Sequence, residues 1–239
     1  MATSTPIPAK AIEIIDKMET KLSGKNLLVV LKNEEGKKRF TRLKGPLPNE
    51  EKLIIDVSGK IKQESRLYIE GKISPLIQGG KVFRDEKGRL ISYSALQPTI
   101  NLYDGKYHWI YTPYDNKFIK REKGRDFAKV MRRFFLSGFV PLKENLIEAL
   151  PIIEKIEVKK TKYEGKESFL MTFYIQKKNK ARYWIDAKKY LPLQSEFETK
   201  EKSGTYIIRR KVLKIKINPN LPPDVFVFTP PRGAKPEIL

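Results

Sequence analysis

Hydrophobic positions near the start of the chain repeat with helical spacing. Between Pro8 and Leu22 the apolar residues lie three or four positions apart, with lysine and acidic residues between them. Gly24 follows, and glycine commonly ends a helix. The pattern therefore predicts one amphipathic helix near the N-terminus. Residues 1–8 are small and include proline, so we expect a loose lead-in there.

After Gly24 the hydrophobic period changes to two, which is typical of β-strands. Short alternating segments follow one another to residue 121 and resume over 156–217. Turn-forming residues separate them, and Asp104-Gly105 is a strong hairpin signal. Glu34-Glu35-Gly36 indicates a turn after the first strand. Because strands do not alternate with helices, the pattern predicts a mainly β (α+β) fold, a meander of about ten antiparallel strands.

Residues 124–150 interrupt the strands with a second helical pattern. Its apolar residues form a stripe at i, i+3, i+4, i+7 and i+8, consisting of Phe127, Val130, Met131, Phe134 and Phe135. Leu142, Leu146 and Leu150 predict a further short helix. No change in composition marks a domain boundary. We therefore expect a single domain over residues 1–239, with 124–150 as a helical lid insertion.

The sequence offers little for catalysis. Cysteine is absent and His108 is the only histidine, so neither a thiolate nucleophile nor a two-histidine metal site can form. Acidic residues such as Asp56 and Glu70 alternate with the apolar strand positions, which places them toward solvent. Glycine-rich phosphate-binding motifs are missing. We expect no enzyme activity, no cofactor and no bound metal, and a structural or surface role for His108.

The chain carries 49 Lys+Arg against 28 Asp+Glu, a net charge of +21 that is spread evenly along the sequence. Such a field attracts nucleic acid, phospholipid head groups or acidic proteins. A surface rich in lysine and glutamate is also typical of heat-adapted organisms (thermophiles). Tyr107, Trp109 and Tyr111 share one strand face, but no nucleic-acid-binding motif accompanies them. Nucleic acid is therefore the less favoured partner.

Nearly every predicted strand presents one large hydrophobic face, as the alternating residues from Phe169 to Ile175 do. A sheet of about ten strands tends to curl, and its concave side must be filled or covered. Two interpretations remain open: the helices fill this side completely, or they cover a hydrophobic ligand cavity as a lid. The candidate cavity and lid residues are Leu53, Ile55, Val57, Leu67, Ile69, Tyr107, Trp109, Tyr111, Phe127, Val130, Met131, Phe134 and Phe135.

Three segments carry a family resemblance: YDGKYHWIYTP at 103–113, YWIDAKKYLPLQSEFE at 183–198 and LPPDVFVFTPPRGAKP at 221–236. They resemble the LolA/LolB-type family of periplasmic lipoprotein carriers and lipoprotein-sorting proteins. Their order and spacing extend the resemblance from Ala9 to Pro236. It implies an incomplete antiparallel β-barrel around a hydrophobic cavity, with helices over the opening. Carrier members commonly have an Arg-Pro pair where this chain has Ser74-Pro75.

The resemblance also implies a function. It implies non-catalytic binding, transport or sorting of acylated lipoproteins or lipids in the periplasm or cell envelope, as part of outer membrane biogenesis. The N-terminal MATSTPIPAK has no apolar region of a signal peptide, so we expect an export signal to be absent from this sequence. We further expect a monomer that meets anionic membrane surfaces. The alternatives are a basic β-protein that binds nucleic acid and a sensor or interaction module on the same fold.

Overall fold

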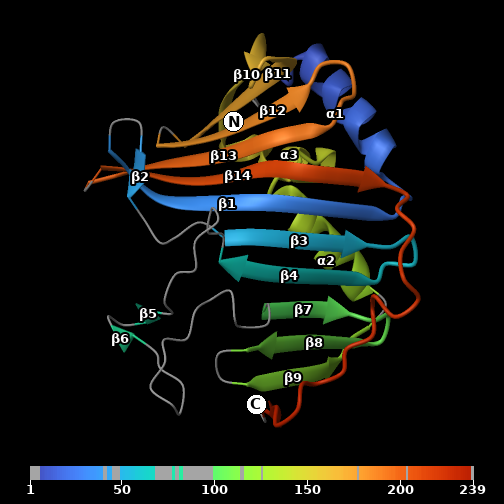
Figure 1. The fold of residues 1–239 in the computed structure, drawn as a ribbon. Helices are drawn as coiled ribbons and strands as arrows, with labels where there is room; N and C mark the ends of the chain where they lie inside the picture. Colours follow the sequence, from blue (N-terminus) through green and yellow to red (C-terminus); the bar gives the residue numbers. More distant parts are fainter. Residues whose placement is uncertain are drawn as a thin grey trace.

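A computed structural model describes residues 6–39, 42–44, 49–67, 77–78, 81–82, 99–113, 116–124, 126–176, 178–202 and 204–237. Most of these residues form one sheet of 13 strands, in the order β10-β11-β12-β13-β14-β1-β3-β4-β7-β8-β9-β15, with β2 beside β1 (Figure 1). A separate pair, β5-β6, completes the described strands. The path between β10 and β15 does not close, so the sheet is an incomplete barrel.

The strands are β1 (Leu27–Arg39), β2 (Arg42–Lys44), β3 (Asn49–Ile55), β4 (Ile61–Leu67), β5 (Ile77–Gln78), β6 (Lys81–Val82), β7 (Thr99–Tyr103), β8 (Tyr107–Thr112), β9 (Lys117–Glu122), β10 (Ile153–Tyr163), β11 (Lys166–Ile175), β12 (Asn179–Asp186), β13 (Pro192–Glu201), β14 (Gly204–Ile217) and β15 (Lys235–Pro236). The helices are α1 (Ala9–Leu22), α2 (Asp126–Ser137), α3 (Lys143–Ala149) and the short 3₁₀ turn η2 (Leu150–Ile152).

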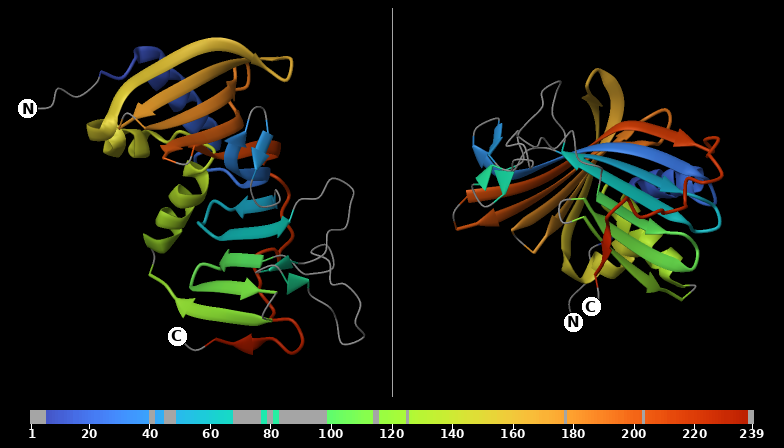
Figure 2. Two further views of the ribbon diagram at one scale, coloured as in Figure 1. Left: turned by 90° about the vertical axis from the view of Figure 1, so that its left-hand side faces the viewer. Right: turned by 60° about the horizontal axis from the view of Figure 1, so that its bottom comes forward.

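The sheet curls around its helices. In Figure 2 the end of the sheet from β10 to β13 bends over, and the helices lie on one side of the sheet, here called the concave face. The mainly β architecture, the open barrel and the helical cover are therefore confirmed. The sheet contains more strands than the ten expected, partly because short strands such as β2 and β15 carry no strong sequence pattern.

Helix α1 forms where the periodic spacing predicted it, and it supplies much of the core. Its buried residues are Ala11, Ile14, Ile15, Met18 and Leu22. They join Val29 of β1 and Leu53 of β3 in one cluster, in which these side chains are almost fully buried. Fully burying an aliphatic side chain of this kind contributes about 1.5–3 kcal/mol. The core is therefore concentrated where α1 covers the sheet.

The prediction of a turn at Glu34-Glu35-Gly36 was wrong, because β1 continues through these residues. Gly36 pairs with Ile207 of β14, and Lys37 pairs with Tyr206. The long partner strand β14 offers hydrogen bonds along this whole segment, and glycine accommodates the φ of 145° found at Gly36. Tertiary pairing therefore overrides the local turn composition.

The Asp104-Gly105 turn is confirmed, and side-chain hydrogen bonds explain its strength. The Asp104 carboxylate accepts hydrogen bonds from the backbone N–H of Lys106 at 2.9 Å and of Tyr107 at 2.7 Å. It also accepts one from the indole N–H of Trp109 at 2.9 Å. These donors hold the pKa of Asp104 below its ordinary value, although burial opposes the shift. The turn fixes the register of β7 and β8.

Helices α2 and α3 lie within the segment predicted to be helical. Helix α2 approaches the turn between β3 and β4 closely, since a Cβ at Gly59 would lie 2.8 Å from Cβ of Ala128. Arg132 of α2 donates to the carbonyl of Leu22 at the end of α1, at 2.8 Å. Lys143 of α3 contacts α1 through an ion pair with Asp16 at 2.9 Å. The three helices thus form one connected cover.

Candidate ligand-binding site

Strand pairing determines which side chains share the concave face, because residues opposite each other point to the same side. Ala181 of β12 lies opposite Phe173 of β11 and Phe197 of β13. Tyr183 lies opposite Ser195, which in turn lies opposite Arg210 of β14. These side chains face α3 and the segment between α2 and α3. The candidate site is built from them.

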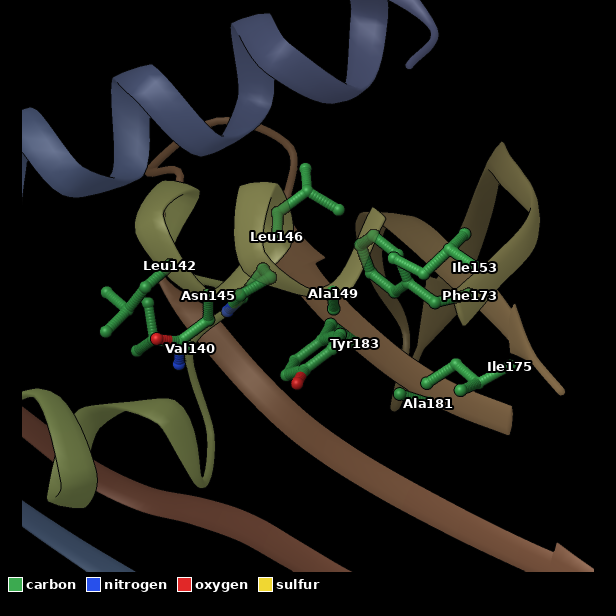
Figure 3. Close-up of a pocket in the computed structure, with 11 residues that line it drawn as sticks. Val140, Leu142, Asn145, Leu146, Ala149, Ile153, Phe173, Ile175, Ala181 and Tyr183 are labelled. Carbon is green, nitrogen blue, oxygen red and sulfur yellow. The ribbon is translucent and has the colours of Figure 1, made fainter. Parts of the chain in front are cut away.

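An apolar hollow of about 130 Å³ lies between α3 and strands β10–β12. We call it the α3 pocket; it is lined by Val140, Pro141, Leu142, Asn145, Leu146, Ala149, Ile153, Phe173, Ile175, Ala181 and Tyr183 (Figure 3). Carbon dominates this lining, and Asn145 and Tyr183 contribute its polar side-chain atoms. In Figure 3 the Tyr183 hydroxyl points away from Phe173. The hollow is suited to an apolar group.

A second hollow of about 220 Å³ adjoins the first, because Ala181 and Tyr183 line both. We call it the Arg210 pocket; its lining residues are Ser137, Gly138, Ala181, Tyr183, Ser195, Glu196, Phe197, Ile208 and Arg210. The segment after α2 is attached here, since the Ser195 hydroxyl donates to the carbonyl of Gly138 at 2.7 Å. The two pockets form a track along the concave face.

Tyr183 lies at the junction of the two pockets. Its ring packs edge-on against Phe173, with the ring centroids 5.7 Å apart. Burial raises the pKa of the Tyr183 hydroxyl to about 12, and the charge of Arg210 opposes this rise. The hydroxyl therefore stays protonated at neutral pH. It can donate a hydrogen bond in an otherwise apolar track.

A third hollow, of about 290 Å³, lies between the end of α1 and helices α2 and α3. Its lining combines both signs of charge, including Arg132, Arg133 and Glu144. Arg133 pairs with Glu144 at 3.9 Å and also with Glu148. Leucine and valine side chains line this hollow as well, and Val140 and Leu142 also line the α3 pocket, so its character is mixed.

The structure divides the predicted cavity residues between two faces of the sheet. Leu53 and Ile55 are fully buried on the concave face. The aromatic residues of β8 lie on the opposite face, where Phe228 packs against Trp109 at 5.4 Å and against Tyr111 at 5.8 Å. Lys120 lies over the Tyr107 ring at 4.0 Å on that same face. The C-terminal segment thus covers the aromatic face.

The apolar stripe of α2 is also divided. Phe127, Met131 and Phe135 pack toward the sheet. Val130 and Phe134 are 61% and 69% exposed. A helix contacts a sheet along a narrow line of side chains. The apolar stripe of α2 is wider than this line, so part of it faces outward.

The remaining predicted site residues lie away from the two pockets or outside the described residues. Val57 is 65% exposed in the turn between β3 and β4. Leu67 ends β4, and its side chain is outside the described residues, as are Ile69 and the Ser74-Pro75 pair. Among the predicted residues whose side chains the structure describes, none lines the α3 pocket or the Arg210 pocket. Their role in binding stays a prediction.

The residues that do line the pockets carried partial sequence signals. The alternation from Phe169 to Ile175 marked Phe173 as a hydrophobic strand residue, and the spacing of Leu142 and Leu146 marked a short helix. What the sequence did not indicate is that this helix lies over that strand. Ala181, a small residue that leaves the space empty, has no pattern of its own.

His108 lies on the concave face beneath α2. Its Nε2 lies 2.6 Å from the side-chain oxygen of Asn101. Its ring contacts Phe127, with the centroids 4.8 Å apart. Burial lowers the pKa of His108, and the charges of Lys123 and Arg121 lower it further. The contacts are those of a packed structural histidine.

In the described part of the chain, no group of three or more histidine or acidic side chains is arranged to hold a metal ion. No helix there is long and apolar enough to cross a membrane.

An open antiparallel sheet, a helical cover and apolar hollows between them define an incomplete β-barrel with a covered concave face. The chain belongs to the family described as "Predicted periplasmic protein (DUF2092)", whose model matches residues 81–237. The periplasmic localisation expected from the sequence is thereby confirmed. No curated protein matches the sequence.

Several solved structures share this fold at low identity. An uncharacterized conserved protein from Thermus thermophilus is 12% identical, with a TM-score of 0.52, over 95% of this chain and 98% of that one. MucB is 10% identical, with a TM-score of 0.50, over 94% of this chain, which spans 65% of the MucB chain. MucB of Pseudomonas aeruginosa has also been solved with MucA.

A LolA superfamily protein from Nitrosomonas europaea is matched as well, at 10% identity and a TM-score of 0.35, over 93% of this chain and 99% of that one. Identities this low concern the fold alone. The kinship to periplasmic proteins that the sequence predicted rests on the family assignment.

Proposed function

We propose that this protein is a non-catalytic periplasmic binding protein that buries an acyl chain of a lipid or an acylated lipoprotein. The observation that carries the proposal is the apolar α3 pocket and its continuation into the Arg210 pocket. Each methylene transferred from water to such surroundings contributes about 0.8 kcal/mol. An acyl chain therefore gains binding free energy in proportion to the length it buries.

The size of the pockets supports a cover that moves. The pockets measure about 130 and 220 Å³, whereas small-molecule sites typically occupy about 300–1,000 Å³. An acyl chain longer than a few methylenes must therefore displace α3 and the segment that precedes it. The leucines of the cover occupy part of the space when no chain is bound, which keeps binding reversible.

The contacts of α3 support a low cost of opening. Leu146 is the buried residue of this seven-residue helix. Its ion pairs, such as Lys143 with Asp16, lie at the surface, and surface pairs contribute about 0–1 kcal/mol. By contrast, α1 buries five residues. Helix α3 thus buries fewer residues than either of the other two helices of the cover.

Binding of a fluorescent fatty acid tests the proposal. We expect the fluorescence of the probe to rise on mixing with the protein. Ala149→Trp, which fills the α3 pocket from the helix side, should lower the affinity by about tenfold or more, as the loss of several buried methylenes implies. Leu213→Trp is the matched control, because Leu213 is exposed on β14 and lines neither pocket.

Ala181→Leu provides a second variant that fills the junction of the pockets from the sheet side. Thermal melting checks that each variant is folded. The proposal fails if the folded wild type does not bind the probe, or if both filled variants bind it as tightly as the wild type does.

A further inference from the structure

Arg210 places a positive charge at one end of the apolar track. It lies on β14, opposite Ser195 of β13, and it lines the pocket that Tyr183 shares with the α3 pocket. Phe197 and Ile208 form the apolar walls around it. A guanidinium in these surroundings loses part of its hydration, so a partner with negative charge gains strongly there.

The neighbouring arginines of the sheet are paired, and Arg210 differs from them. Arg209, which points to the opposite face, pairs with Glu196 at 2.8 Å. Arg182 pairs with Glu196 and with Glu198, each at 2.8 Å. Among the residues that the structure describes, no carboxylate forms an ion pair with Arg210. Its N–H donors thus have no carboxylate partner in the described part of the chain, and those that do not pack against Gly138 can meet a ligand.

Gly138 has no side chain, and the Arg210 guanidinium occupies the space that a Cβ there would fill. A Cβ at Gly138 would lie 2.7 Å from Cζ of Arg210 and would collide with its Nη1. The φ of Gly138 is outside the positive range, so a side chain there would displace the end of the Arg210 side chain without straining the backbone. The charge is therefore located where the helical cover meets the sheet.

We propose that Arg210 binds the anionic head of an amphiphile whose acyl chain lies in the α3 pocket, with the Tyr183 hydroxyl as a second donor. This inference rests on the proposed function and specifies its ligand. The recognised group is an anionic oxygen pair, as in a carboxylate or a phosphate, which a guanidinium binds with two parallel hydrogen bonds. Free fatty acids and acidic lysophospholipids both supply it.

Competition with an uncharged fluorescent lipid probe tests the inference. The competitors are hexadecanoic acid, palmitoyl lysophosphatidic acid and hexadecanol, which offer similar chains with a carboxylate, a phosphate or a neutral hydroxyl. We expect at least one of the two anions to displace the probe from the wild type at about tenfold lower concentration than hexadecanol does. The reason is that the neutral alcohol cannot form the charged hydrogen bonds with Arg210 that an anion forms. The stronger anion identifies the source of the head group.

Arg210→Gln should remove this preference, and Arg209→Gln should retain it because Arg209 lies on the other face of the sheet. Arg210→Lys, which keeps the charge without the fork of donors, should retain part of the preference. Melting curves establish that the variants are folded.

Three outcomes overturn the inference. In the first, the wild type binds the anions and hexadecanol equally. In the second, Arg210→Gln or, if that variant is unfolded, Arg210→Lys keeps the full preference. In the third, the wild type binds neither the probe nor any competitor, and this result removes the proposed function as well. Probe binding without a head-group preference removes only the role of Arg210.

Discussion

Adjacent residues of β8 pack on opposite faces of the sheet. Trp109 packs against Phe228 on the convex side, and its indole N–H binds Asp104. His108, one position earlier, packs against Phe127 of the helical cover. Strand alternation produces this division, and it was visible in the sequence. Which of the two faces carries the helices was not visible, because that depends on contacts between distant segments.

The environment of His108 leads to a prediction about pH. Because its pKa in the folded state is lowered, the unfolded chain binds more protons as the pH falls below about 6.5, the ordinary value. The stability that neutral His108 contributes is therefore lost as the pH falls through that value toward the folded pKa. His108→Gln removes the titration and can keep a hydrogen bond to Asn101.

Urea unfolding at a series of pH values between about 7.5 and 5 measures this difference. We expect the free energy of unfolding of the wild type to decline more steeply on acidification than that of His108→Gln. Parallel pH profiles for the two proteins would contradict the assignment.

At the scale of elements, two of the three helices of the cover, α2 and α3, differ in their attachments. Helix α2 is attached by Phe127, Met131 and Phe135, whereas α3 contributes Leu146 and exposed ion pairs. The seam between them contains Gly138, held by Ser195. We therefore expect that opening at α3, with α2 remaining in place, exposes the track at the lowest cost.

Two neighbouring phenylalanines of α2 distinguish its packed side from its outer side. Phe135 is 5% exposed and Phe134 is 69% exposed. Phe135→Ala should lower the free energy of unfolding by about 3–5 kcal/mol, because it leaves a cavity in the core. Phe134→Ala should change it by no more than about 0.5 kcal/mol. Chemical denaturation compares the pair directly, and equal effects would show that α2 is oriented differently.

The sequence predicted the elements better than it predicted their contacts. Spacing identified α1, both helices of the cover and most of the hairpins, since these patterns are local. It missed the continuation of β1 through Gly36, because the long partner β14 supplies hydrogen bonds that local composition does not reveal. It also missed Ala181 and Tyr183, whose importance comes from their position under α3.

At the scale of the whole molecule, the apolar interior is unevenly filled. Helix α1 contributes five buried residues to the core cluster, and the hollows lie beside α3 and the segment before it. The helices therefore pack closely on one region of the concave face and leave hollows beside another, and the binding of a ligand in these hollows stays a prediction. This division allows a well-packed core to coexist with a loosely packed region on the same face of the sheet.

The free edge of the sheet also bears on the whole molecule. In the described sheet, β10 pairs only with β11. Lysines are frequent along it, including Lys155, Lys159 and Lys160. Charged side chains on an edge strand oppose pairing with another chain. This pattern opposes edge-to-edge pairing at β10, and the expected monomer stays a prediction.

Native mass spectrometry tests the central claim most directly. The wild type and Ala149→Trp are incubated with a bacterial envelope lipid extract, separated from free lipid without detergent, and weighed intact. We predict that the wild type retains a species with the mass of an acylated lipid, which is released as such on activation, and that Ala149→Trp retains little of it. A wild type that stays at the mass of the bare chain, or two proteins that retain the same species equally, would contradict the account.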